Sequence, residues 1–275
     1  RANYYPEFMA SLLTSVMNVP DKLSVYLRDC HYHGVQVKAP SINTSTDRFV
    51  ADGEDIRFAL SAIKGVGNVA IKAILEEREQ NGRFKSFKDF ILRLYGNTVN
   101  KTVVEALIKS GAFDVLDDGL TRKQMFEALP KIIKAMNSYK GKIKRIEENE
   151  AKARLPIEAA SFEEVEKEAK KRQKRLKQLA KKRETDRQEL IRLIDKALSS
   201  CPEEFSITEM AGFEKEILGH YVSYHPLDAY SGFYDSLIAQ PQFFVTSTTI
   251  NNYINQNVMT CGYIATAYRR NISTG

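Results

Sequence analysis

The segment from Glu163 to Arg192 constrains the fold of this chain most. Of its 30 residues, 19 are charged and 12 of these are basic. Charged side chains at this density cannot form the interior of a globular domain. Residues 140–198 therefore predict a long, mostly solvated helix or a helical hairpin with weak coiled-coil character. Its apolar stripe, at steps of three and four residues, comprises Phe162, Val165, Ala169, Leu176, Leu179, Leu190, Leu193 and Ala197, with interruptions at Arg172, Arg183 and Asp186.

The rest of the chain has the pattern of short helices, so the expected fold class is mainly α. Apolar spacing predicts helices near residues 4–17, 21–33, 68–80, 86–95, 100–110 and 121–136. Pro130 predicts a kink or break in the last of these. Residues 35–60 and 257–266 alternate like short strands, and a helix within residues 214–230 is expected to end near Ser223.

Composition excludes several classes of protein. The chain has no apolar run long enough for a membrane helix and no signal peptide, and its three cysteines are scattered as in a reducing compartment, so we expect a cytoplasmic location. Cys30, His31 and His33 lie close together but lack further ligands nearby, so no metal site is expected. The net charge of +6 is compatible with a nucleic-acid partner without requiring one. Both ends of the sequence have the pattern of cut ends, which indicates a fragment of a longer protein.

Two glycines one residue apart, Gly65 and Gly67, stand directly before the helix expected at residue 68. A helix N-terminus exposes unpaired N–H groups and the positive end of the helix dipole, both of which attract anions. Glycines at this place remove the Cβ atoms that would keep a phosphate at a distance. We expect Val66 to point inward as an apolar plug. The predicted phosphate-binding residues are Lys64, Gly65, Val66, Gly67, Asn68 and Lys72.

A weaker copy of this pattern occurs some forty residues later, in "EALIKSGAFD". An apolar helix end is again followed by a lysine and a hairpin of small residues, here Lys109, Ser110 and Gly111. Tandem hairpins of this kind hold a duplex backbone without reading its sequence. A plain turn remains the alternative at both places, and this second hairpin matches the glycine pattern less well.

Five stretches of the sequence are, in combination, specific to one family. They are "YYPEFMASLLTS", "IRFALSAIKGVGNVAIKAILEERE", "FKSFKDF", "VNKTVVEALIKSGAFD" and "EKEILGHYVSYHPL". In this order and spacing they resemble the C-terminal half of the alpha subunit family of bacterial replicative DNA polymerase III. The resemblance covers roughly residues 1–130 and 210–275, and the charged segment between them departs from the family pattern as an enlarged insertion.

The resemblance implies a division of the chain into five parts. Residues 1–50 would end the fingers domain, and residues 51–135 would form a tandem helix-hairpin-helix that binds duplex DNA. Residues 136–205 would be the charged helical insertion and 206–245 a linker helix and loop. Residues 246–275 would begin an OB-fold.

The same resemblance implies a function as part of a DNA-directed DNA polymerase, a nucleotidyltransferase. The catalytic carboxylates and their Mg²⁺ would belong to a palm domain upstream of Arg1, so no catalytic residue or cofactor is expected here, and the chain alone should be inactive. Two non-enzymatic alternatives are a helix-hairpin-helix module of a repair or nuclease accessory protein and a coiled-coil adaptor built on residues 140–198.

The resemblance also implies replisome partners, among them a sliding clamp. Its binding peptide would be a glutamine followed by spaced apolar residues, and the candidate is Gln188 with Leu190, Ile191 and Leu193. This peptide lacks the usual terminal aromatic residue, and Leu190 and Leu193 also serve the helical stripe, so a purely structural role is the favoured alternative.

Overall fold

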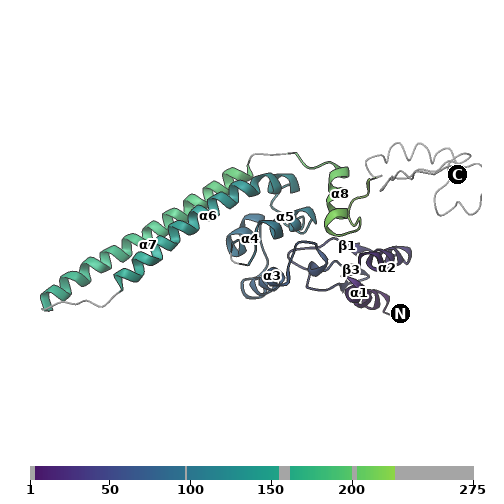
Figure 1. Cartoon of the computed structure of the whole chain (residues 1–275), viewed down its shortest axis with the longest axis horizontal. Helices are drawn as coiled ribbons and strands as arrows, with labels where there is room; N and C mark the ends of the chain where they lie inside the picture. The colour runs from purple at the N-terminus through teal and green to yellow at the C-terminus, as the bar shows by residue number, and fades with distance from the viewer. Residues whose placement is uncertain (1–3, 97, 155–161, 200–202, 227–275) are drawn as a thin grey trace, which may run out of the picture. The chain divides into compact units, whose positions relative to one another are not determined.

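The computed structural model describes residues 4–96, 98–154, 162–199 and 203–226, and the chain divides into two units, residues 1–205 and 206–275. Helices predominate among the described residues (Figure 1), which confirms the mainly α fold class. No described helix is long and apolar enough to cross a membrane. The expected OB-fold strand at 257–266 lies outside the described residues.

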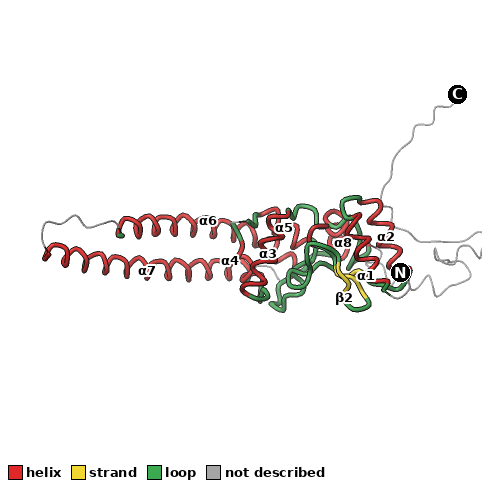
Figure 2. Tube along the Cα trace, turned by 90° about the horizontal axis from the view of Figure 1, so that it is seen from below, coloured by secondary structure: helices red, strands yellow, loops and turns green. Residues whose placement is uncertain are grey.

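The first unit begins with a pair of packed helices, α1 (Tyr5–Val16) and α2 (Pro20–Tyr32). A proline stands in the first turn of each helix, where the missing N–H costs no hydrogen bond. Both helices pack on a small sheet (Figure 2) formed by β1 (Val37–Lys38), β2 (Val50–Asp52) and β3 (Asp55–Arg57). The strand order is β1-β3-β2, with β1 parallel and β2 antiparallel to β3.

Four short elements follow the sheet: a 3₁₀ turn η1 (Leu60–Ala62), α3 (Asn68–Asn81), α4 (Phe87–Leu94) and α5 (Lys101–Lys109). Their ends differ by one or two residues from the predicted helices. Ser86 and Asn100 cap α4 and α5 by accepting hydrogen bonds from N–H groups of the first turn. A buried cluster of edge-to-face rings, with centroids 5.0–5.1 Å apart, forms the core between these helices and contains Phe84, Phe87, Phe90 and Phe113.

Helices α6 (Arg122–Ala153) and α7 (Phe162–Leu198) lie side by side as a long hairpin (Figures 1 and 2). The structure therefore selects the hairpin from the two arrangements predicted for the charged segment. Of the kink or break predicted at Pro130, the break is wrong, and so is the predicted helix end near residue 136, because α6 continues through the proline to Ala153. Pro130 lies on the exposed side of α6.

The residues of α7 that face α6 differ in part from the predicted stripe. Ile194 is fully buried, whereas Leu193 is 45% exposed and Val165 is 37% exposed. Two residues predicted to interrupt the stripe belong to the interface instead. Asp186 is buried and binds Lys142 of α6 at 3.2 Å, and Arg183 reaches Glu150 at 3.4 Å. The hairpin accepts charge at core positions because α6 supplies a partner for each.

Helix α8 (Ile207–Ile217) opens the second unit with a capping box between Ser206 and Glu209. The prediction that this helix ends near Ser223 is wrong, because Gly219 adopts a left-handed conformation (φ +75°) and terminates it. The buried carboxylate of Glu214 then accepts hydrogen bonds from the N–H groups of Val222, Ser223 and Tyr224. Glu214 therefore organises this turn.

Candidate nucleic-acid interface

The first predicted hairpin, residues 63–67, connects η1 to α3. Gly65 has φ +90°, a conformation that other residues rarely adopt. Val66 is only 7% exposed, which confirms the apolar plug. Its N–H donates to the carbonyl of Ile63 at 3.2 Å, so this donor is not available to a ligand, contrary to the expected role of Val66 in phosphate binding.

The N-terminus of α3 is open. The carbonyl of Gly67 accepts the first helical hydrogen bonds, from Ala70 at 3.0 Å and Ile71 at 3.1 Å. Within the part of the chain that the structure describes, the N–H groups of Gly65, Gly67, Asn68 and Val69 donate to no acceptor. Three of these four donors belong to the N-cap and first turn of the helix, where the helix dipole is positive.

The two glycines of this hairpin differ in backbone conformation and in surroundings. Gly65 requires glycine because of its positive φ, and a Cβ there would touch the Cβ of Ala106 at 3.5 Å. Gly67 has φ −81° and ψ 158°, an extended conformation open to any residue, and a Cβ there would meet nothing within 4 Å. The turn itself therefore does not require Gly67. Its missing side chain leaves the α3 N-terminus accessible from outside.

Charges around this hairpin restrict where a phosphate could approach. Lys64 is exposed, and no carboxylate lies within ion-pair distance of it among the described residues. Lys72 is 76% exposed but lies 3.6 Å from Glu76, so part of its charge is balanced. The groove that Lys72 lines also contains Asp47, Arg48 and Glu79, so its carboxylates outnumber its basic groups. An anion is therefore favoured on the side of Lys64.

The second predicted hairpin does not offer donors to a ligand. The N–H groups of Ser110, Gly111 and Ala112 all donate to carbonyls of α5, at 3.0 Å each. Ser110 is fully buried, and no helix begins directly after this turn, since α6 starts at Arg122. The N–H groups of Ser110 and Gly111, expected here to contact a phosphate, therefore already have acceptors within α5.

Arg122 explains why Gly111 is glycine. Its side chain is 2% exposed, its Nε donates to Asp114 at 3.0 Å, and its Nη1 donates to the carbonyl of Lys109 at 3.3 Å. A Cβ on Gly111 would collide with the Nη2 of Arg122. The "SGAFD" turn therefore holds a buried guanidinium and joins α5 to the start of α6.

A different turn, between α4 and α5, resembles the first hairpin. Gly96 has φ +88° and Val99 is 1% exposed, values close to those of Gly65 and Val66, although the valine comes three positions after the glycine here and directly after it in the first hairpin. Asn100 then occupies the N-cap position that Gly67 holds before α3. The pattern of a glycine, a buried valine and a capping residue is readable in "GNTVNK", although this turn was not among the predicted hairpins.

The two similar turns lie close together. A Cβ on Gly65 would be 3.7 Å from the Cγ2 of Thr102, in the first turn of α5. Within the described residues, the N–H groups of Lys101 and Thr102 donate to no acceptor, while that of Val103 is taken by the side chain of Asn100. Lys101 is exposed and lies 3.4 Å from Glu105. Two open helix N-termini, those of α3 and α5, therefore form one surface suited to an anionic polymer.

The predicted clamp peptide lies within α7. Leu190 is 3% exposed and belongs to the interface with α6, and the amide of Gln188 donates to Glu184 at 3.1 Å. Leu193 is the most exposed apolar side chain of the four. These residues are helical, as the structural alternative for this peptide requires.

The cysteine and histidine considered as possible metal ligands, Cys30 and His33, lie in ordinary packed or hydrogen-bonded surroundings. Burial raises the pKa of the Cys30 thiol to about 11, which keeps it protonated. His33 shares a hydrogen bond of 3.1 Å with the hydroxyl of Tyr5. Across the described ranges, no three His, Cys, Asp or Glu side chains gather into a group that could hold a metal ion.

Comparison with known proteins agrees with this geometry. Residues 34–125 match the helix-hairpin-helix motif family, and this range contains both similar turns. The chain is 35% identical to DNA polymerase III subunit alpha of Borreliella burgdorferi over 240 residues, which is 86% of this chain and 18% of that protein. The identity is 36% to the Deinococcus radiodurans protein of the same name, over 84% of this chain and 15% of the relative.

A higher identity is found over a shorter range. The Thermus aquaticus DNA polymerase III subunit alpha is 47% identical over 118 residues, which is 43% of this chain and 10% of the relative. The chain thus spans less than a fifth of the length of these relatives. The resemblance of this chain to one segment of the DNA polymerase III alpha subunit family, a segment with a helix-hairpin-helix motif, is therefore confirmed.

Proposed function

We propose that this chain holds the duplex for a replicative DNA polymerase. The observation that carries the proposal is the pairing of two open helix N-termini, those of α3 and α5, beside Lys64 and Lys101. Backbone N–H groups and lysines bind phosphates and make no contact with base edges, so binding would not depend on sequence. The similarity to polymerase subunits extends well beyond the hairpins, which favours this role over an isolated DNA-binding module.

The activity that this binding serves is template-directed DNA synthesis by the whole protein. A grip on the duplex backbone keeps the primer terminus at the catalytic centre between additions. In a full-length polymerase, loss of the grip would shorten the product of each binding event while leaving single-nucleotide addition at saturating DNA unchanged. We infer a cytoplasmic location for the same reason, since the bacterial chromosome is there.

The decisive experiment replaces Gly67 with valine. The φ and ψ of Gly67 suit valine, and a Cβ at this position would have no heavy atom within 4 Å, so the melting temperature should not change. The side chain would obstruct phosphate approach and remove about 1–3 kcal/mol of charge-assisted hydrogen bonding, or roughly 5- to 150-fold in affinity. Fluorescence anisotropy with a labelled duplex measures this effect.

Two controls accompany this measurement. Gly212→Val adds the same side chain on an exposed face of α8, where a Cβ also meets nothing within 4 Å, and should leave binding unchanged. Affinity should fall steeply between ~50 and ~200 mM salt and hardly vary with base sequence. Undiminished duplex binding by a folded Gly67→Val variant would show that this hairpin is only a turn.

A sliding clamp is the secondary candidate partner. We propose that contact would use the exposed side of residues 188–193, since Leu190 is committed to α6. Gln188→Ala with Leu193→Ala should then abolish capture by the cognate clamp without lowering the melting temperature. Capture that survives this double change would remove the segment from consideration.

A further inference from the structure

The middle of α7 carries charge of one sign only. Between residues 169 and 183 the sequence has nine lysines and arginines and no aspartate or glutamate. Acidic residues return on both sides, at Glu166 and Glu168 before this stretch and at Glu184 and Asp186 after it. The basic block is therefore a local feature of the hairpin and does not reflect the composition of the whole helix.

Four of the basic residues form a stripe on one face of α7. Lys170, Lys174, Lys177 and Lys181 follow steps of four, three and four residues, which places them on one side of the helix over about 16 Å. They line a shallow groove together with Gln173 and Gln178, and no carboxylate contributes to it. All six side chains of the groove are exposed and can donate hydrogen bonds.

The stripe differs from the face of α7 that packs on α6. On that inner face each charge has a partner: Arg183 reaches Glu150 at 3.4 Å, and Asp186 binds Lys142 at 3.2 Å. On the stripe only Lys170 has an ion pair, with Glu166 at 2.6 Å. Within the described residues, no carboxylate lies in ion-pair range of Lys174, Lys177 or Lys181.

Such a stripe opposes the stability of the helix that carries it. Like charges three and four residues apart repel each other, and alternating signs would have provided solubility without this repulsion. The concentrated charge becomes favourable when an anionic partner lies along it. A duplex supplies about one charge per 1.7 Å of its axis, more than enough for four lysines over this length.

We infer that the stripe of Lys170, Lys174, Lys177 and Lys181 is a second contact for the phosphates of duplex DNA. It is separate from the turns that precede α3 and α5. Single strands are bound mainly by stacking on aromatic side chains, and α7 has no aromatic residue after Phe162. The inference concerns the same class of ligand as the proposed function but depends on different residues. The stripe would extend the DNA contact of the chain along α7. Its lysines lie roughly 20 to 40 Å along the helix from Asp195, at the base of the α6–α7 hairpin.

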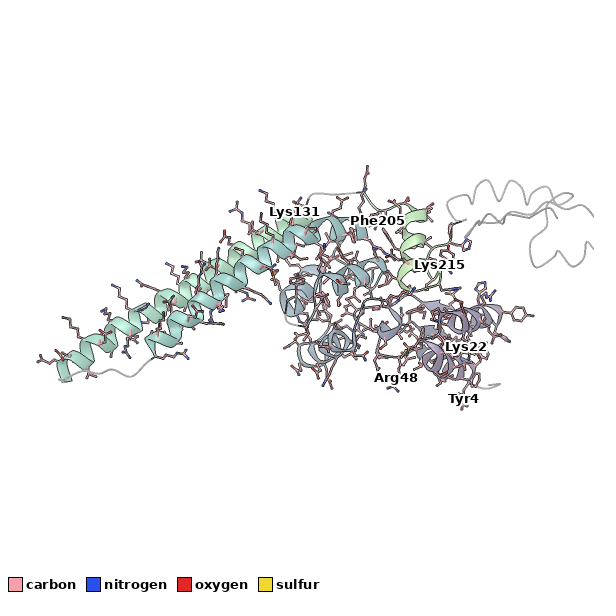
Figure 3. All side chains as sticks on the ribbon, viewed as in Figure 1. Tyr4, Lys22, Arg48, Lys131, Phe205 and Lys215 are labelled. Carbon is pink, nitrogen blue, oxygen red and sulfur yellow. The ribbon has the colours of Figure 1, made fainter. Side chains whose placement is uncertain are left out.

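The test uses the full chain and a labelled duplex of about 30 base pairs, in which the salt dependence counts phosphate contacts. The stripe variant changes Lys170, Lys174, Lys177 and Lys181 to glutamine. The matched control changes four exposed lysines of α6 to glutamine: Lys131, which projects from the hairpin (Figure 3), with Lys134, Lys144 and Lys152. Both variants lose four charges, and glutamine preserves helix propensity.

The stripe variant should bind the duplex at least ~10-fold more weakly at ~100 mM salt, with a salt slope reduced by about 2–4, one contact contributing about 0.9. The control should change the slope by less than one contact. Replacing the same four lysines with arginine should preserve binding, and the Lys174→Gln, Lys177→Gln double variant should show an intermediate loss. Circular dichroism melts confirm that each variant keeps its fold.

Equal affinities for the stripe variant and the control would show that the stripe is only a solvated face, and overturn the inference. The inference would also be overturned if the stripe variant lost affinity for single-stranded DNA alone. A loss of affinity for poly-glutamate alone would overturn it too and would indicate an acidic protein partner. The Gly67→Val variant separates the two proposals. If Gly67→Val weakens duplex binding and the stripe variant does not, only the proposed function is supported. If the stripe variant weakens binding and Gly67→Val does not, only the contact through the stripe is supported.

Discussion

Gly65 packs against Thr102, so that a Cβ on the glycine would stand 3.7 Å from the methyl group of the threonine. This contact joins two turns that are more than thirty residues apart in the sequence. It also places the first turn of α5 beside the hairpin that precedes α3. The distance between the two helix N-termini is therefore set by direct packing between the elements that would hold the duplex.

Substitution of the two glycines should separate folding from binding. Gly65→Ala must accommodate φ +90° and should lower the free energy of unfolding by about 1–2 kcal/mol. Gly67→Ala should leave it unchanged or slightly raised, because its backbone is extended and its surroundings are open. Urea unfolding followed by circular dichroism measures both. Equal destabilisation by the two alanines would contradict the extended backbone and open surroundings of Gly67.

The lysines beside the two N-termini should contribute unequally to duplex binding. Lys64→Gln should reduce the salt slope of the binding constant by about 0.9, the equivalent of one phosphate contact, and Lys101→Gln should reduce it less, because Glu105 lies 3.4 Å from Lys101 and balances part of its charge. Lys72→Gln should reduce it less, because Glu76 already balances part of that charge at 3.6 Å. Lys22→Gln, an exposed change on α2, is the control and should have no effect. A larger loss at Lys72 than at Lys64 would move the interface to the other side of α3.

The first hairpin was largely predictable from sequence because its signal is local. The spacing of Gly65, Val66 and Gly67 before an apolar helix indicated the plug and the open N-terminus. The second predicted hairpin was less readable, since "SGAFD" looks like a glycine hairpin until its N–H groups are counted. Carbonyls of α5 accept all three N–H groups of this turn, and Arg122, from a separate helix, packs its buried guanidinium against Gly111. Such a contact between distant residues leaves no mark on local spacing.

The hairpin of α6 and α7 shows the same limit of prediction. Alternating steps of three and four residues identified the helices and most of the stripe. They did not show that Asp186 and Arg183 would occupy interface positions, because the partners that compensate their charges, Lys142 and Glu150, lie on the other helix. Nor did Pro130 reveal that it would face solvent and leave α6 continuous.

Gly111→Ala should destabilise the chain more than Gly65→Ala. Both positions have positive φ, but only at Gly111 would the new Cβ overlap a buried group, the guanidinium of Arg122. Displacing Arg122 also breaks its hydrogen bonds to Asp114, so we expect a loss of about 2–4 kcal/mol. Thermal and urea unfolding of the two variants test the order. A smaller loss at Gly111 would show that Arg122 moves aside without cost.

The small sheet should lose stability in acid. The hydrogen bond from Arg57, at 2.7 Å, lowers the pKa of Asp52, and that from Lys38 lowers the pKa of Asp55. A lowered pKa in the folded state stabilises the fold above the unfolded pKa, about 3.9 for aspartate. This contribution is lost as the pH falls through the folded pKa. Unfolding experiments from pH 7 to pH 2 should therefore show a decline below about pH 4.

A substitution at Lys38 tests the cause of this decline. Lys38→Met should raise the pKa of Asp55 more than that of Asp52, because Asp52 keeps its hydrogen bond from Arg57. NMR titration of the two carboxylates resolves the difference. Equal shifts at both residues would mean that Lys38 acts on them only through long-range charge.

Helix α6 begins at the capping box of Thr121 and continues without interruption to Ala153, a rod of about 48 Å. Several contacts hold the hairpin near its base, among them the hydrogen bond from Lys140 to the carbonyl of Gly96, the ion pair of Lys88 with Asp195 at 2.7 Å and the hydrogen bond from Gln124 to the carbonyl of Leu198 at 2.8 Å. The hairpin is thus fastened to α4, α5 and the turn between them, so a force on its distal part would reach the region of the two open helix N-termini through these elements.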